Sequence, residues 1–69
     1  MNYYEVCYEK DGRDFMRFLD KSESLEGLIK KYKKEGKEVF MVHQYPRKPE
    51  GDEFMHMETK QVLKVRNAR

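Results

Sequence analysis

The chain has 69 residues, of which 38% are hydrophobic and 41% are charged. A chain of this length forms one domain with a thin core, because it buries only about 60% of the surface that its unfolded form exposes. Its 15 basic and 13 acidic residues leave a net charge of +2, which is too small to predict nucleic-acid binding from composition alone. The single cysteine, Cys7, excludes an internal disulfide and a cysteine-rich zinc site.

The location of the protein follows from what the sequence lacks. No apolar run approaches the roughly 18 residues that a transmembrane helix needs, and the N-terminus has no long apolar signal-peptide core. A lone cysteine suits a reducing compartment. We therefore predict no membrane association and a cytoplasmic location, in a bacterium or an infected host cell.

The first third of the chain predicts a β-hairpin. Residues 3–10 and 13–20 are β-prone, and the Asp-Gly pair between them is the strongest short hairpin signal. A two-residue turn pairs residues whose numbers add up to about 23. This register places Tyr8 opposite Phe15 and Val6 opposite Arg17.

Residues 21–36 predict one amphipathic helix. Its apolar stripe has the helical i, i+3, i+4, i+7 spacing and consists of Leu25, Leu28, Ile29 and Tyr32. Ser22 or Ser24 can cap the start of the helix, and Gly36 is the expected left-handed stop.

Two further strands are expected over residues 37–45 and 53–65, joined by a loop over residues 46–52, and residues 66–69 are expected to fray. The element order is then ββαββ. We predict an α+β fold of two layers, with one helix packed on one face of a four-stranded, mostly antiparallel sheet. Residues 1–69 form a single compact domain in this prediction.

The stretch HQYPRKPEGDEFMH, which runs from His43 to His56, reads almost as a mirror about its centre. A symmetric hairpin would place His43 opposite His56 and Tyr45 opposite Phe54. Both histidines would then lie on the sheet face away from the helix. Near a reference pKa of about 6.5, charging both would weaken whatever packs against them.

One helix covers only one side of a sheet. In the predicted register Phe40 and Val42 lie in the core below the helix, and an apolar patch remains on the other face. The predicted contact residues of that face are Tyr3, Phe18, Met41, His43, Tyr45, Phe54 and His56. Contiguous exposed apolar patches mark interfaces. The alternative is a register that is off by one residue, which would exchange the two faces.

From this patch we predict a non-enzymatic protein that binds a protein partner, or a second copy of itself, through the sheet face. Small size, high charge and one apolar face are typical of accessory proteins of phages and mobile elements that act on a host factor, such as inhibitors of host defence. A homodimer would use the same kind of face.

Catalysis and metal binding have little support in the sequence. Cys7 lacks a predicted histidine neighbour, the glycines are isolated, and two histidines are fewer than the three or four ligands of a zinc site. We therefore predict no catalytic residue, no metal, no cofactor and no small-molecule substrate.

The alternative function is nucleic-acid binding by basic clusters at the end of the helix, in the following loop and along the C-terminal strand. The candidate phosphate contacts are Lys30, Lys31, Lys33, Lys34, Lys37, Arg47, Lys48, Lys64 and Arg66.

Overall fold

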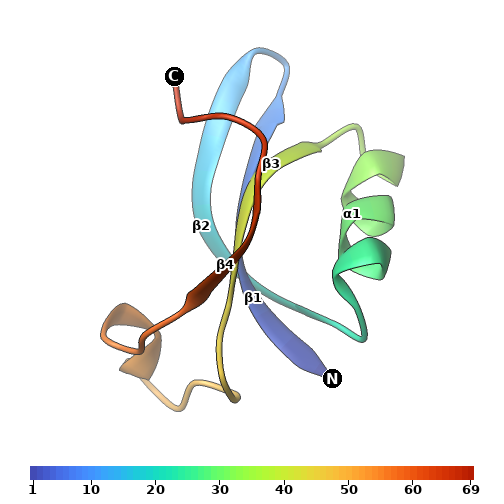
Figure 1. The fold of residues 1–69 in the computed structure, drawn as a ribbon. Helices are drawn as coiled ribbons and strands as arrows, with labels where there is room; N and C mark the ends of the chain where they lie inside the picture. The colour runs from blue at the N-terminus through green and yellow to red at the C-terminus, as the bar shows by residue number, and fades with distance from the viewer.

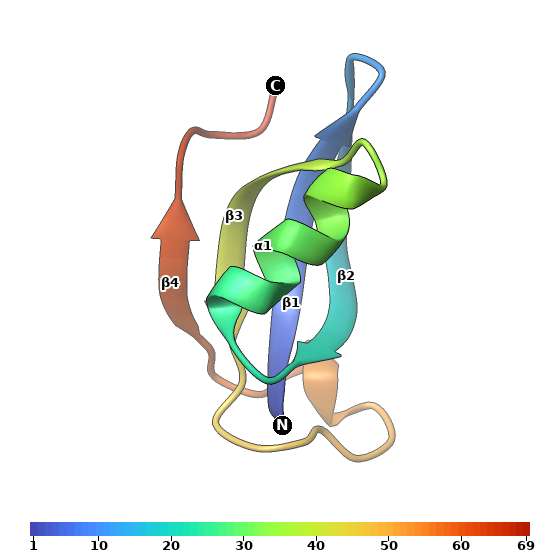
Figure 2. The same ribbon diagram turned by 90° about the vertical axis from the view of Figure 1, so that its right-hand side faces the viewer.

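The computed structural model describes all 69 residues, Met1–Arg69. Its elements are β1 (Asn2–Lys10), β2 (Arg13–Ser22), α1 (Leu25–Lys34), β3 (Glu38–Gln44), the 3-10 helix η1 (Glu53–Met55) and β4 (Lys60–Lys64). The strands form one antiparallel sheet in the order β2-β1-β3-β4, with α1 against one face (Figures 1 and 2). The predicted α+β fold of the ββαββ kind is confirmed. Neither helix has the length and apolar character needed to cross a membrane.

The ends of α1 follow from local sequence. The Ser24 hydroxyl caps the first turn and accepts a 3.0 Å hydrogen bond from the Gly27 amide. At the other end Gly36 has a φ of +75°, and the amides of Gly36 and Lys37 donate to the carbonyls of Lys33 and Tyr32. These two hydrogen bonds form a Schellman motif, which favours glycine because of its positive φ. The predicted helix and its glycine stop are confirmed.

The core lies between α1 and the sheet. Its buried members are Tyr4, Val6, Tyr8, Leu28, Tyr32 and Val42. Leu28 and Tyr32 of the predicted helix stripe lie in this core and Leu25 packs against it, whereas Ile29 is half-buried outside it. Aromatic rings extend this core along the first hairpin, since the Tyr8 ring stacks on Phe15 and meets the edge of Tyr32, at centroid distances of 5.1 and 5.4 Å.

Every pair of neighbouring strands contains one β-bulge. The extra residue is Arg17 where β2 faces β1, Phe40 where β3 faces β1, and Val62 where β4 faces β3. A bulge bends the strand and shifts the alternation of side chains beyond it by one position. A register predicted from regular pairing therefore cannot hold on both sides of a bulge.

The first hairpin shows this effect directly. Tyr8 faces Phe15, as predicted, but beyond the bulge Val6 faces Phe18 instead of Arg17. Phe18 therefore turns toward the helix face, where its ring centroid lies 5.5 Å from that of Tyr8. Its predicted place on the uncovered face is wrong.

Phe40 was expected below the helix and lies on the other face. The residue is only 2% exposed but lies outside the helix-side core, and the Arg66 guanidinium covers its ring at 4.1 Å. Arg66 also binds Glu9 and Asp14, whose positions alternate with the helix-facing pair Tyr8 and Phe15. Val42 does lie in the core, as predicted.

The mirror-like stretch does not form a symmetric hairpin. His43 pairs with Gln61, and His56 ends η1 as an exposed residue. The expected strand over residues 53–65 is reduced to β4, because the chain before it folds into a 3-10 turn. Arg47 holds this turn through a bidentate ion pair with Glu53, at 2.6 and 2.8 Å.

Two segments lie over the sheet face opposite α1. The 46–59 loop with η1 crosses one end of that face, and the C-terminal segment approaches the other end (Figure 1). The face that was expected to be uncovered is therefore partly covered by the chain itself.

Candidate functional site

One predicted contact on the sheet face, Tyr45, is withdrawn from solvent, and the others are half-buried or exposed. Tyr45 is buried, and its hydroxyl lies 3.4 Å from two acceptors that share its single proton, the Glu5 carboxylate and the Phe54 carbonyl. Burial, and then the Glu5 charge, raise the pKa of this tyrosine. Tyr45 thus anchors the 46–59 loop, and η1 presents the neighbouring Phe54 and Met55 to solvent.

The two histidines lie apart on different elements. His43 on β3 is half-buried, with its Nδ1 atom 3.8 Å from a Glu5 oxygen and without a hydrogen-bond partner. His56 lies beyond η1 beside Arg47 and Glu53. The shared, pH-sensitive pair of histidines is not formed. Tyr3 and Met41 are half-buried, and their role as contacts stays a prediction.

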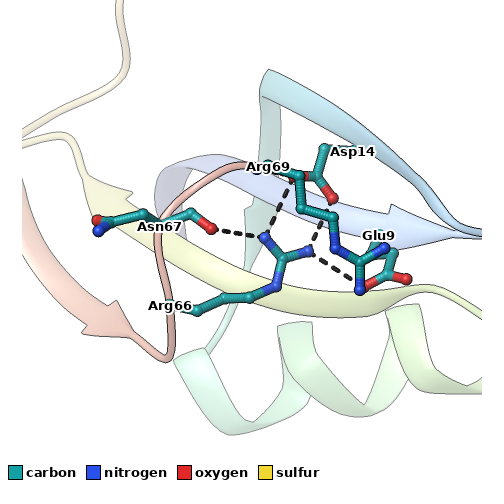
Figure 3. Close-up of polar contacts among 5 residues, drawn as sticks. All are labelled: Glu9, Asp14, Arg66, Asn67 and Arg69. Carbon is teal, nitrogen blue, oxygen red and sulfur yellow. Dashed lines mark hydrogen bonds and ion pairs between the residues drawn. The ribbon is translucent and has the colours of Figure 1, made fainter.

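The C-terminal segment is bound by an ion cluster (Figure 3). Arg66 forms a bidentate pair with Asp14, at 2.7 and 3.2 Å, and reaches Glu9 at 3.1 Å. The Arg69 amide also donates to Asp14 at 2.7 Å. The hydrogen bonds from Arg66 and then Arg69 lower the pKa of Asp14 to about 2. Residues 66–69, which were expected to fray, are held against the first hairpin.

Several of the predicted phosphate contacts are already paired with acids. The ion pairs are Lys30 with Glu26, Lys31 with Asp20, Lys37 with Glu35, Arg47 with Glu53, and Arg66 with Glu9 and Asp14. The remaining four are Lys33, Lys34, Lys48 and Lys64, and they are distributed over α1, the 46–59 loop and β4. The structure does not gather them on one strand or helix, and their role as phosphate contacts stays a prediction.

Exposed apolar side chains gather on β2 instead. Met16, Phe18 and Leu19 are 42%, 46% and 50% exposed and lie within four residues of one another. The bulge at Arg17 divides them between the faces: Phe18 points to the helix side, and Leu19, opposite Glu5, points to the other side. Strand β2 therefore exposes apolar area on both faces of the sheet.

Strand β2 is also an edge of the sheet (Figure 2). It has ten residues, whereas the other edge strand, β4, has five and carries no large exposed apolar side chain. Short, charged edges are the usual protection against unwanted strand pairing. Strand β4 fits that description, and β2 does not.

The acidic side chains of β2 are paired with other parts of the fold, whereas its basic side chains are not. Asp14 is engaged by the C-terminal arginines, and Asp20 accepts hydrogen bonds from Lys31 and Tyr32. Burial alone would raise the pKa of Asp20, but its hydrogen bonds outweigh that effect and lower it.

Three basic residues of β2 have no such partner in the fold. They are Arg13, Arg17 and Lys21, all of them exposed and without an ion pair. Together with Met16, Phe18 and Leu19 they form what we call the edge surface.

Sequence reasoning identified Phe18 as a contact but placed it on the wrong face of the sheet, and it missed Leu19. The signal that would have corrected this is the bulge, yet Arg17 gives no local hint of its φ of +60°. Glycine or asparagine is the usual residue in that conformation.

Comparison with known proteins assigns no family to this chain. No protein-family model, no curated protein and no solved structure matches it. No three His, Cys, Asp or Glu side chains lie close enough together to hold a metal ion. The edge surface is a candidate site because it combines exposed apolar side chains with a strand edge that no other strand pairs.

Proposed function

We propose that this chain is a non-enzymatic binding protein that engages a protein partner through the edge surface of β2. The observation that carries the proposal is the exposure of Met16, Phe18 and Leu19 on a long edge strand that pairs only with β1. Aromatic residues, methionine and arginine are enriched at protein interfaces. The proposed partner is a protein, as expected from the sequence, but the proposed contact surface lies at the edge of the sheet and not in the middle of its open face.

In this proposal the chain is an accessory protein of a phage or mobile element. It acts on a host factor in the bacterial cytoplasm, as an inhibitor of host defence does. A small domain that binds through one strand edge suits such a role, because a protein that inhibits by covering a partner's surface needs no catalytic site. The buried free thiol of Cys7 is compatible with a reducing compartment.

Affinity capture with matched variants tests the function. The immobilised protein is exposed to a nuclease-treated bacterial extract, and retained proteins are compared with those held by the double variant Met16→Ser, Leu19→Ser. We expect retention by the unaltered protein, loss in that variant, and no change in the control Met55→Ser, Val65→Ser. The control also removes two exposed apolar side chains, from outside the edge surface.

Two results would contradict the proposal. One is a retained protein that the Met16→Ser, Leu19→Ser variant still holds with equal affinity. The other is a protein that is retained from an untreated extract but not from the nuclease-treated one, which would favour the basic-cluster alternative instead.

A further inference from the structure

We propose that the partner supplies an extended, acidic segment that adds to β2 as a fifth strand of the sheet. This inference rests on the proposed function and names the binding mode and the chemistry of the partner. It follows from the backbone of the edge, its charges and the position of the bulge.

The backbone of β2 is available for strand addition. Strand β1 is its only neighbour in the sheet, so its outer amides and carbonyls face no other strand. An extended peptide can continue such a ladder with main-chain hydrogen bonds, while side chains on alternate positions supply specificity.

The charges of the edge select an acidic occupant. Arg13, Arg17 and Lys21 are free, whereas Asp14 and Asp20 are both engaged within the fold. A second copy is a poor occupant, because β2 pairing with itself brings cations together and offers no free carboxylate from the strand. Opposite charges across a strand pair are favourable, and like charges are not.

The bulge limits where regular pairing can occur. Arg17 divides the edge into Arg13–Met16 and Phe18–Ser22. The second part is longer and contains two of the three exposed apolar side chains, Phe18 and Leu19. We therefore assign the docking segment to Phe18–Ser22, which accommodates about five partner residues, or roughly 17 Å of strand.

The test begins with a displayed library of random twelve-residue peptides, selected against the intact protein. We expect the enriched peptides to contain Glu or Asp alternating with apolar residues. One selected peptide is then labelled, and its affinity is measured by fluorescence anisotropy. Binding should slow amide hydrogen exchange within Phe18–Ser22 more than elsewhere in the sheet.

Charge reversal provides the first discriminating variant. Arg17→Glu with Lys21→Glu should weaken the peptide at least tenfold, and a version of the peptide with Lys in place of its acids should recover binding to that variant. The control Lys33→Glu, Lys34→Glu reverses two exposed lysines of α1 that make no ion pair, and should change the affinity less than twofold.

An N-methyl scan of the peptide tests the strand geometry. Alternate amides of a strand point to the same side, so methylation should abolish binding at every second position and be tolerated between. A scan without this alternation overturns strand addition, although the edge surface would still be the binding site. If the Met16→Ser, Leu19→Ser variant still retained the partner protein, that result would instead contradict the proposed function itself.

Three other outcomes would also overturn the inference. The first is a selection that yields no binder, or only neutral or basic peptides. The second is a dimer in light scattering that Phe18→Ser converts to a monomer, which would make a second copy the occupant. The third is tight binding of a single-stranded oligonucleotide that Arg17→Glu with Lys21→Glu abolishes.

Discussion

The Arg66 guanidinium lies 4.1 Å from the centre of the Phe40 ring and shields one of the most deeply buried aromatic side chains in the fold. The same guanidinium joins the C-terminal segment to Asp14 on β2 and Glu9 on β1. One side chain thus combines stacking, a bidentate ion pair and the anchoring of the segment.

We expect Arg66→Lys to lower the thermal midpoint by several degrees, because an ammonium group neither stacks on an aromatic ring nor forms the bidentate pair. Thermal unfolding followed by circular dichroism measures this change. Lys64→Arg, an exposed position on β4, is the control and should leave the midpoint nearly unchanged. Equal effects of the two substitutions would show that Arg66 does not anchor the segment.

The stability of the fold should depend on pH in the acid range. Hydrogen bonds from Arg66 and Arg69 lower the pKa of Asp14 from 3.8 to about 2, and those from Arg47 and the Glu50 amide lower the pKa of Glu53 from 4.5 to about 2. A depressed folded-state pKa stabilises the fold above the unfolded-state pKa, so this contribution is complete above about pH 5 and is lost as the pH falls toward 2.

Urea unfolding at a series of pH values tests this dependence. Asp14→Asn and Glu53→Gln should each flatten the decline of unfolding free energy below pH 5. Asp52→Asn, whose carboxylate makes no ion pair, should leave the slope unchanged. A wild-type protein with no decline between pH 5 and 2 would contradict the prediction.

Arg17, at the bulge of β2, has a φ of +60°, a left-handed conformation that residues other than glycine rarely adopt. Arg17→Gly should leave the unfolding free energy unchanged or raise it slightly. Glycine adopts the left-handed conformation without steric strain, and this gain offsets the larger conformational entropy that glycine loses on folding. Arg17→Val should lower the unfolding free energy by about 1–3 kcal/mol, because a β-branched side chain resists this conformation. Chemical denaturation distinguishes the two, and a Val variant as stable as the Gly variant would argue against the bulge.

The anchoring of the 46–59 loop depends on the ring of Tyr45 more than on its hydroxyl. Both hydrogen bonds of the hydroxyl are 3.4 Å long, so Tyr45→Phe should cost less than about 1 kcal/mol. Tyr45→Ala removes a buried ring and should cost about 3 kcal/mol or more. Urea unfolding gives both values, with Tyr3→Phe as the control for loss of a tyrosine hydroxyl. Similar losses for Tyr45→Phe and Tyr45→Ala would show that the hydroxyl is the anchor.

The parts of the fold that depend on neighbouring residues were predictable from the sequence. Ser24 and Gly36 set the ends of α1, and the Asp-Gly turn sets the start of the first hairpin. These signals act through backbone conformation within a few residues. The element order follows from them together with hydrophobic spacing, which also places Leu28, Tyr32 and Val42 in the helix-side core.

The parts that depend on distant contacts were not predictable in this way. Residues 53–59 were expected to begin the last strand, but the Arg47–Glu53 ion pair holds the start of this segment in a 3-10 turn. Phe40 lies on the other face because it is the extra residue of the bulge between β3 and β1, and Arg66, near the end of the chain, covers its ring there. The apolar candidates on β2 could be identified from composition, but their faces could not, because a single bulged residue exchanges them.

The three bulges also bear on how this chain should be compared with others. Each inserts one residue into a strand, so inward and outward positions exchange at that point. A gapless alignment with a regular ββαββ sheet would match core positions with solvent positions along half of a strand. Comparison by structure should place single-residue gaps at Arg17, Phe40 and Val62.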